Sequence, residues 1–99
     1  MSHYVIVQMD PTDHELLAEY RPKALAPILA HGGTVIAAGP NEVLEDNGGG
    51  PLGTVIIRFP SAEAAKDWFN DPAIADVHAM RNKAAKSTIT LYPEFKVPS

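Results

Sequence analysis

The chain has 99 residues, 45% of them hydrophobic and 20% charged, which is the composition of a single globular domain spanning residues 1–99. Its net charge of −4, with eight scattered Lys and Arg, argues against a nucleic-acid partner. The absence of cysteine, of a membrane-length apolar run (~18 residues) and of a signal-peptide pattern in MSHYVIVQMD leads us to expect a cytoplasmic protein without membrane contact.

The first half of the chain predicts a strand, a helix and a second strand. Residues 3–9 form a continuous apolar run rich in β-branched side chains, which is typical of a strand. Apolar residues then recur at helical spacing over residues 14–31, with Asp13 or Thr12 as the N-cap and Gly32-Gly33 as the stop signal. Pro22 and Pro27 fall inside this helix, so we expect a kink or a restart near Arg21. A short strand follows at residues 34–38.

The second half repeats this order. A loop that could hold a short strand at residues 42–45 leads into NGGGPLG, which we interpret as a flexible hairpin tip because it lacks the Lys and Ser/Thr of a phosphate loop. Residues 54–59 are the strongest strand, Ser61 is a natural N-cap for a second helix, and residues 88–92 form the last strand. The predicted order β-α-β-β-α-β is the ferredoxin-like arrangement of an α+β domain.

The second helix contains signals that stop and restart a helix, in the stretch WFNDPAIADVHAMR, residues 68–81. Asn70 can end one helical piece, Asp71 can cap the next, and Pro72 suits a first helical position. We therefore expect a bent or broken helix with Trp68 and Phe69 just before the bend. An aromatic pair at this place is more often part of the core than of a site.

Arg81 lies within the apolar stripe of this last helical piece. At about 100° per residue, with Ile74 at zero, Val77 falls near 300° and Arg81 near 340°. A buried arginine has to be paired or bound to an anion. Two interpretations stay open: a structural arginine that pairs with a carboxylate or reaches water, and a guanidinium that holds an anionic substrate group.

The strands predict a sheet with two different faces, because side chains alternate in direction along a strand. One set is wholly apolar and should face the helices: Val5, Val7, Met9, Val55, Ile57, Phe59, Ile89 and Leu91. The other set mixes aromatic, aliphatic and polar residues, and the members that we expect to face a dimer partner are Tyr4, Ile6, Gln8, Ile56, Arg58 and Tyr92. Since helices cover only one face in this fold, we predict that a second copy covers the mixed face in a two-fold homodimer. The alternative is a monomer with a tolerably polar sheet.

Several features in order along the chain resemble one family. They are Asp13, Tyr20, Gly32-Gly33, Gly39, EVLE at residues 42–45, FPS at residues 59–61, Trp68, Pro72 and Arg81. This set is similar to the bacterial proteins grouped as domain of unknown function 1330, in the dimeric α+β barrel superfamily. The chain departs from the pattern at Asp46, where a glycine is usual, and at Ile74, where an aromatic residue is common.

The resemblance implies a four-stranded antiparallel sheet, face-to-face dimers, and small-molecule pockets between sheet and helices. Relatives in the superfamily include cofactor-free monooxygenases, muconolactone isomerase and haem-binding enzymes, but a shared fold does not transfer function.

Other chemical groups give weaker signals. His3, His14, His31 and His78 lack metal-site spacing, so we expect no metal and no cofactor, although a haem ligand at His78 would follow from the superfamily analogy. His31 suits the negative end of the first helix. Glu45 could be a general base or could pair with Arg81 or Arg58.

The sequence thus leads to two hypotheses. The favoured one is a homodimer with a small pocket lined by Tyr20, Trp68, His78 and Arg81, with Glu45 at its rim. This pocket would bind a small organic acid or aromatic metabolite, with isomerase or cofactor-free oxygenase chemistry as an option; Arg81 would hold the anion and Tyr20 or His78 would move a proton. The alternative is a non-catalytic dimeric binding or accessory module. A cavity beside Arg81 that no carboxylate fills would favour the first.

Overall fold

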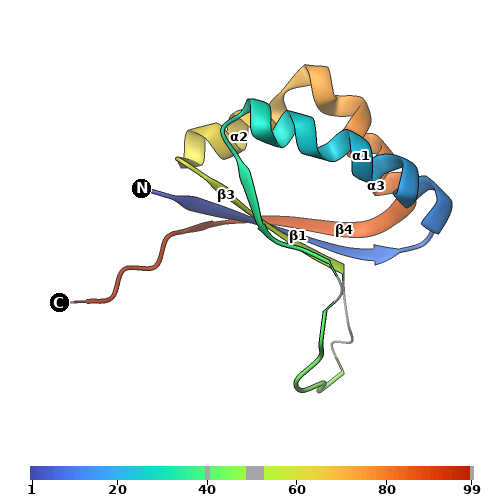
Figure 1. Ribbon diagram of the computed structural model, residues 1–99, viewed down its shortest axis with the longest axis horizontal. Helices are drawn as coiled ribbons and strands as arrows, with labels where there is room; N and C mark the ends of the chain where they lie inside the picture. Colours follow the sequence, from blue (N-terminus) through green and yellow to red (C-terminus); the bar gives the residue numbers. More distant parts are fainter. Residues whose placement is uncertain (40, 49–52, 99) are drawn as a thin grey trace.

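The computed structural model describes residues 1–39, 41–48 and 53–98 and forms an α+β sandwich of one sheet and one helical layer (Figure 1). The elements in chain order are β1 (His3–Pro11), α1 (His14–Ala30), β2 (Thr34–Ala37), β3 (Gly53–Phe59), α2 (Ala62–Asn70), the 3-10 turn η1 (Pro72–Ile74), α3 (Ala75–Ala84) and β4 (Ala85–Pro93). The four strands pair antiparallel in the order β2-β3-β1-β4. This confirms the predicted ferredoxin-like fold.

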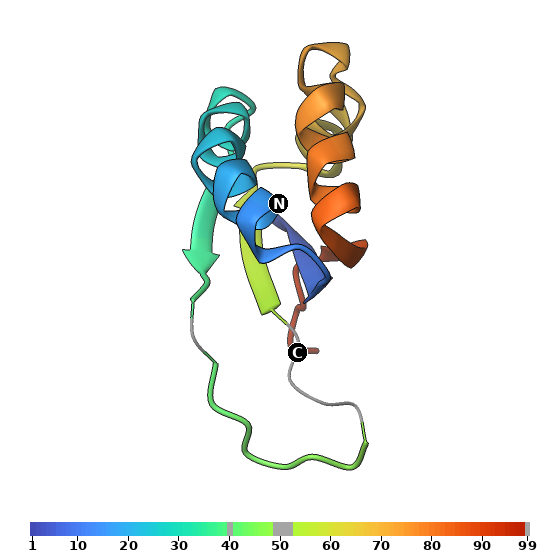
Figure 2. The same cartoon turned by 90° about the vertical axis from the view of Figure 1, so that its right-hand side faces the viewer.

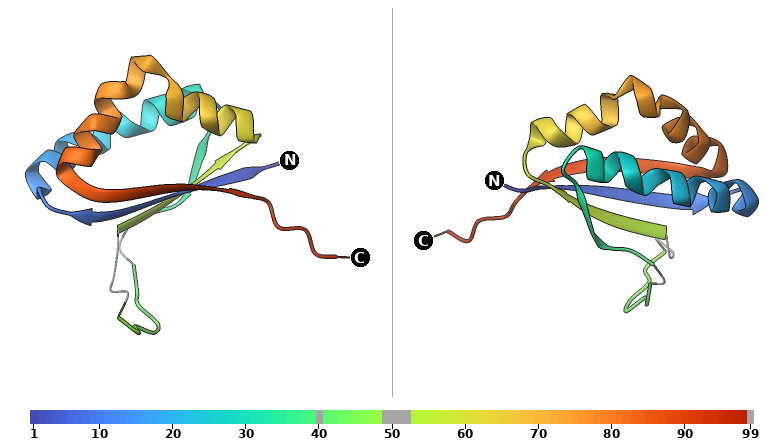
Figure 3. Two further views of the ribbon diagram at one scale, coloured as in Figure 1. Left: turned by 180° about the vertical axis from the view of Figure 1, so that it is seen from behind. Right: turned by 45° about the horizontal axis from the view of Figure 1, so that its top comes forward.

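All the helices cover the same face of the sheet. Figure 2 shows α1 and α3 side by side above the strands, and the two views of Figure 3 show no helix of the described chain on the opposite face. Where strands pair, residues directly opposite each other point to the same face, so β1 sets the pattern: Val5 pairs with Ile57 and Leu91, and Ile6 with Ile56 and Thr90.

The helix-facing set forms the core. Phe59, Leu17 and Ile57 are the largest fully buried side chains, and Val5, Val7 and Met9 of β1 are buried beside them. Leu91 belongs to this set by register but is 37% exposed, because it lies near the end of the edge strand β4.

The mixed set lies on the uncovered face, as the alternation predicts. In the single chain Tyr4, Ile6 and Ile56 are half-buried, whereas Gln8, Arg58 and Tyr92 are exposed. Apolar side chains of the segments beyond the sheet are also exposed: Leu44 (92%), Phe95 (82%) and Val97 (81%).

Helix α1 does not restart at Arg21. It runs unbroken from His14 to Ala30 through Pro22 and Pro27, so the prediction of a restart is wrong. Each proline removes one N–H and leaves one carbonyl four residues earlier, at Ala18 and Lys23. Both of these residues are exposed, so water can satisfy their carbonyl groups.

Both ends of α1 are tied to the rest of the domain. At its start the Asp13 side chain accepts from Leu16 N at 3.0 Å, and the backbone N–H groups of Thr12 and Asp13 donate to the Ala84 carbonyl at 2.8 and 3.0 Å. At its end Gly32 has a φ of +79°, a conformation that favours glycine. A Cβ on Gly33 would lie 2.7 Å from a ring carbon of Phe59, so only glycine lets the chain pass there without displacing the core.

A histidine–aspartate pair adds to the tie at the end of α1. His31 Nε2 donates to Asp71 Oδ2 at 2.9 Å, which joins α1 to the junction between α2 and η1. This hydrogen bond lowers the pKa of the Asp71 carboxyl below its ordinary value of 3.8.

The predicted break in the second helix is confirmed. Helix α2 ends at Asn70, Asp71 Oδ1 accepts from Ala73 N at 2.9 Å, and Pro72 is the first residue of η1. Ser61 caps α2 by accepting from Ala64 N at 3.1 Å, also as predicted.

The short strand considered at residues 42–45 does not form. These residues have no regular structure and belong to a segment on the side of the sheet away from the helices (Figure 1). A strand at residues 42–45 would need the free edge of a neighbouring strand to pair with. The edge nearest in sequence is β2, but β2 is short and ends at Ala37 after a bulge. The hairpin tip predicted at NGGGPLG falls mostly on residues 49–52, which lie outside the described residues.

None of the described helices is both long and apolar enough to cross a membrane.

Candidate functional site

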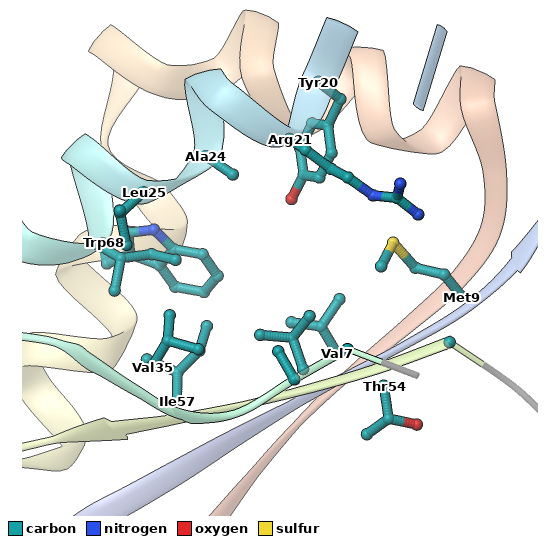
Figure 4. Close-up of a pocket in the computed structure, with 15 residues that line it drawn as sticks. Val7, Met9, Tyr20, Arg21, Ala24, Leu25, Val35, Thr54, Ile57 and Trp68 are labelled. Carbon is teal, nitrogen blue, oxygen red and sulfur yellow. The ribbon is translucent and has the colours of Figure 1, made fainter. Parts of the chain in front are cut away.

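A pocket of about 620 Å³ lies between α1 and the sheet (Figure 4). Its walls are mostly aliphatic and come from five elements: Val7 and Met9 of β1, Ala24, Leu25 and Ile28 of α1, Val35 of β2, Val55 and Ile57 of β3, and Trp68 of α2. A pocket of this size and composition suits a small, largely apolar molecule.

The pocket lies under the middle of α1, where Ala24 presents little bulk to the sheet. Ala24 is half-buried, lines the pocket and carries only a methyl group over the sheet. The fixed ends of α1 keep the helix from moving down onto the strands, so the space above Val7 and Ile57 remains open.

Two polar groups enter this apolar space from consecutive residues of α1. Tyr20 is 8% exposed and its hydroxyl points into the pocket (Figure 4), where it has no hydrogen-bond partner within the described part of the chain. The oxygen itself is not fully buried, because it faces the open space of the pocket, and its hydroxyl is therefore available to a ligand. The Arg21 guanidinium lies at the end of the pocket near Met9, and Trp68 lies toward the other end (Figure 4).

Arg81 lies in a different place, a polar cluster between α3 and β4. It is 2% exposed, as its position on the apolar stripe predicts. Its Nη1 donates to His78 Nδ1 at 2.9 Å, its Nε to Ser87 Oγ at 3.4 Å and its Nη2 to Asn82 Oδ1 at 3.4 Å. Ser87 Oγ in turn donates to Asn82 Oδ1 at 2.8 Å. All of these partners are neutral groups or a histidine, and no carboxylate of the described residues pairs with Arg81.

The contact with Arg81 fixes the state of His78. Because a guanidinium can only donate, Nδ1 must accept and the proton of the neutral ring is on Nε2. Burial lowers the pKa of the His78 imidazole below its ordinary value of 6.5, and the Arg81 charge lowers it further, against the opposing effect of the Trp68 and Phe69 carbonyls. Nε2 is buried and makes no hydrogen bond of good geometry with the described residues.

Trp68 is the wall between the cluster and the pocket. Its ring meets the His78 ring edge-on, with centroids 5.2 Å apart and an interplanar angle of 85°, and contacts the Phe59 ring at 5.6 Å. Trp68 also lines a smaller pocket of about 240 Å³ between α2 and β4, together with Val5, Phe69 and Ile89.

The structure therefore divides the five candidate residues. Tyr20 and Trp68 line the large pocket, whereas His78 and Arg81 contact each other in the cluster and are absent from the described lining. Glu45 is exposed on the loop and accepts from Asn47 Nδ2 at 3.1 Å rather than from an arginine. Within the described residues no three His, Asp or Glu side chains are grouped to hold a metal ion.

Sequence reasoning did not single out Arg21, Ala24 as a pocket residue, or the His31–Asp71 pair. Arg21 looks like any exposed helical arginine, and Ala24 looks like an ordinary member of the apolar stripe. The only available signal was the adjacency of Tyr20, on the buried side of the helix, to a charged residue.

Solved structures with low sequence identity share this fold. A protein of unknown function from Rhodopseudomonas palustris is 17% identical with a TM-score of 0.78, over 97% of this chain and 84% of its own. A dimeric ferredoxin-like protein of unknown function from Jannaschia sp. CCS1 is 14% identical with a TM-score of 0.70, over 95% of this chain and 100% of its own. SnoaB, a cofactor-independent oxygenase from Streptomyces nogalater, is 7% identical with a TM-score of 0.68, over 97% of this chain and 95% of its own.

No curated protein matches the chain. The family described as domain of unknown function (DUF1330) matches residues 2–95, nearly the whole sequence, and agrees with the resemblance seen in the ordered motifs. The chain belongs to the DUF1330 family.

Proposed function

We propose that this protein is a homodimer that binds a small, largely apolar organic molecule in the pocket between α1 and the sheet. The observation that carries the proposal is the pocket of about 620 Å³, walled by aliphatic side chains and Trp68, into which the Tyr20 hydroxyl points without a partner. A preformed apolar cavity with few polar groups is the usual form of a small-molecule site.

The uncovered sheet face supports the dimer. Ile6 lies between Ile56 and Thr90 across the strands, and Tyr4 lies between Arg58 and Tyr92. The exposed apolar residues Leu44 of the loop and Phe95 of the tail add to the apolar surface that is costly to leave in water. The Jannaschia protein of the same fold is described as dimeric.

The lining favours binding over acid–base catalysis. The described lining residues include no carboxylate, imidazole or thiol, so Tyr20 is the only one that could exchange a proton. We therefore rank the binding module above an isomerase or an oxygenase. A cofactor-independent oxygenase, as SnoaB is described, is the second candidate, because SnoaB has the same fold.

Arg81 and His78 take a supporting role in this proposal. Their cluster contacts Trp68 through the His78 ring and so holds the indole that forms the pocket wall. The anion-holding role that the sequence suggested for Arg81 would need a path through Trp68.

Binding is tested with a neutral aromatic probe, 2-naphthamide, and the indole N–H signal of Trp68, the one tryptophan of the chain. We expect a saturable shift of this signal in a ¹⁵N–¹H spectrum. Ala24→Phe should fill the pocket and weaken binding by about tenfold or more, since a large side chain in a filled space excludes the probe. The matched control is Ala26→Phe, on the exposed side of the same helix. Equal affinity in all three proteins would contradict the proposed site.

The dimer is tested by light scattering over a range of concentrations. We expect twice the chain mass of 10.6 kDa for the wild type, and a folded monomer for Ile6→Glu, which places a charge in the centre of the uncovered face. Leu29→Glu, at an exposed position of α1, is the control and should stay dimeric. A wild-type mass of 10.6 kDa at every concentration would disprove the dimer.

A further inference from the structure

We infer that the pocket selects aromatic carboxylates, with the ring against Trp68 and the carboxylate held at the opening by Arg21. This inference rests on the proposed function, since it names the class of ligand for the same pocket. It replaces Arg81 by Arg21 as the residue that meets an anion.

The first argument is the charge of the lining. Arg21 is the only charged side chain among the described lining residues, in a protein whose net charge is −4. The described lining has no carboxylate to hold a cationic ligand. An anionic group at the opening would be attracted by the positive charge of Arg21, although the net negative charge of the protein repels it.

The second argument is that the guanidinium of Arg21 has no partner of its own. Along a helix, ion pairs form between residues three or four positions apart, and at those positions Arg21 has Leu17, Ala18, Ala24 and Leu25. No other described residue forms an ion pair or hydrogen bond with it. Its planar fork of donors is therefore free for a bidentate contact with a carboxylate.

The third argument is the arrangement of the lining groups. Trp68 lies toward one end of the pocket and the Arg21 guanidinium lies at the end near Met9, with the Tyr20 hydroxyl between them (Figure 4). Arg21 is exposed whereas Trp68 and Tyr20 are buried, so the charge lies at the opening and the apolar space lies inside. A ligand with an aromatic body and an acidic head matches this order, and the Tyr20 hydroxyl can donate to an acceptor along its length.

The experiment compares two probes of nearly equal shape, 2-naphthoate and 2-naphthamide, by the shift of the Trp68 indole N–H signal. We expect the wild type to bind the naphthoate about tenfold more tightly, with a preference that declines as salt is added. Arg21→Gln should remove this preference by weakening naphthoate binding far more than amide binding, and Arg21→Lys should keep only part of the preference, because an ammonium group lacks the fork.

The control is Lys23→Gln, which removes the same charge from an exposed position of α1 outside the described lining. It should change both affinities by less than twofold. Because Arg21 is exposed and makes no ion pair or hydrogen bond with another described residue, its variants should fold like the wild type.

The outcomes separate the two proposals. If both probes bind equally and Arg21→Gln changes neither affinity, the carboxylate class is wrong while the pocket stands. If Lys23→Gln weakens naphthoate binding as much as Arg21→Gln, the preference reflects the general charge of α1, and the role of Arg21 is disproved. If neither probe shifts the Trp68 signal, the small-molecule site itself is overturned together with the ligand class.

Discussion

The helical layer holds two arginines in opposite conditions. Arg81 on α3 is 2% exposed, and each of its three guanidinium nitrogens donates to a neighbour from α3 or β4. Arg21 on α1 is exposed and has no partner among the described residues. The buried arginine stood out in the sequence because it interrupts an apolar stripe, whereas the exposed one had no distinguishing pattern.

The two regions differ in what they leave available to a ligand. Around Arg81 the donors and acceptors satisfy one another, with His78 Nε2 as the exception in the described structure. Around Arg21 the guanidinium and the Tyr20 hydroxyl are both unpaired and both border open space. In this domain the buried charge of Arg81 meets a structural requirement, whereas the unpaired donors beside the cavity are the groups that we propose contact a ligand.

The largest contrast should come from removing each arginine in turn. Arg81→Ala should lower the free energy of unfolding by about 3 kcal/mol, because it leaves a cavity and a buried acceptor on His78 without its donor. Arg21→Ala should change it by less than about 0.5 kcal/mol, as expected for an exposed side chain. Denaturant unfolding at one fixed protein concentration measures both, since the stability of the proposed dimer would depend on concentration. Similar losses of unfolding free energy in the two variants would show that the two arginines do not differ in their structural role.

A smaller contrast concerns two hydroxyl groups. Ser87→Ala removes a group that links Arg81 to Asn82 and should cost about 1 kcal/mol of stability. Tyr20→Phe removes a hydroxyl without an internal partner, so stability should stay the same or rise slightly. The same unfolding measurement decides between these expectations, and a clear loss in Tyr20→Phe would show that its hydroxyl has an internal role.

The smallest effect is a pH dependence that belongs to the Arg81 cluster. The folded state lowers the pKa of His78 below 6.5, so in acid the unfolded chain takes up a proton that the folded imidazole resists. Stability from this group is therefore complete above pH 6.5 and is lost progressively as the pH falls below that value. The charge facing His78 is Arg81 of α3, and the carbonyls facing it are those of Trp68 and Phe69 of α2.

His78→Gln keeps an acceptor for Arg81 but cannot titrate, so its stability should fall less between pH 7 and pH 5 than that of the wild type. The difference between the two proteins isolates His78 from the other histidines. Identical pH profiles would rule out this contribution. The Asp71 carboxyl acts in a separate range, because its lowered pKa makes its contribution disappear only as the pH falls below about 3.8.

Much of the fold could be predicted because its signals are local. The alternation along residues 3–9 and 54–59 correctly assigned the two faces of the sheet, and Asn70-Asp71-Pro72 correctly located the break between α2 and α3. The burial of Arg81 also followed from the helical period alone.

The arrangement of the site depends on contacts that periodicity does not contain. The pocket needs side chains from β1, α1, β2, β3 and α2, and its size is set by how far α1 lies from the sheet. His31 and Asp71 are 40 residues apart in the sequence, and the local sequence around each of them does not predict that they pair. Glu45, expected at the pocket rim, lies on an exposed loop and is not among the described lining residues.

Helix α1 is fixed at both ends and unsupported in the middle. The Ala84 carbonyl holds the start of the helix. The close approach of Gly33 to Phe59 and the hydrogen bond from His31 to Asp71 hold its end. The pocket beneath its middle is therefore already formed in the unliganded chain, so the proposed ligand would spend no binding free energy on moving the helix. The association rate of such a ligand should then be limited by its diffusion to the pocket opening. The backbone of α1 should have the same position in the free and in the bound protein.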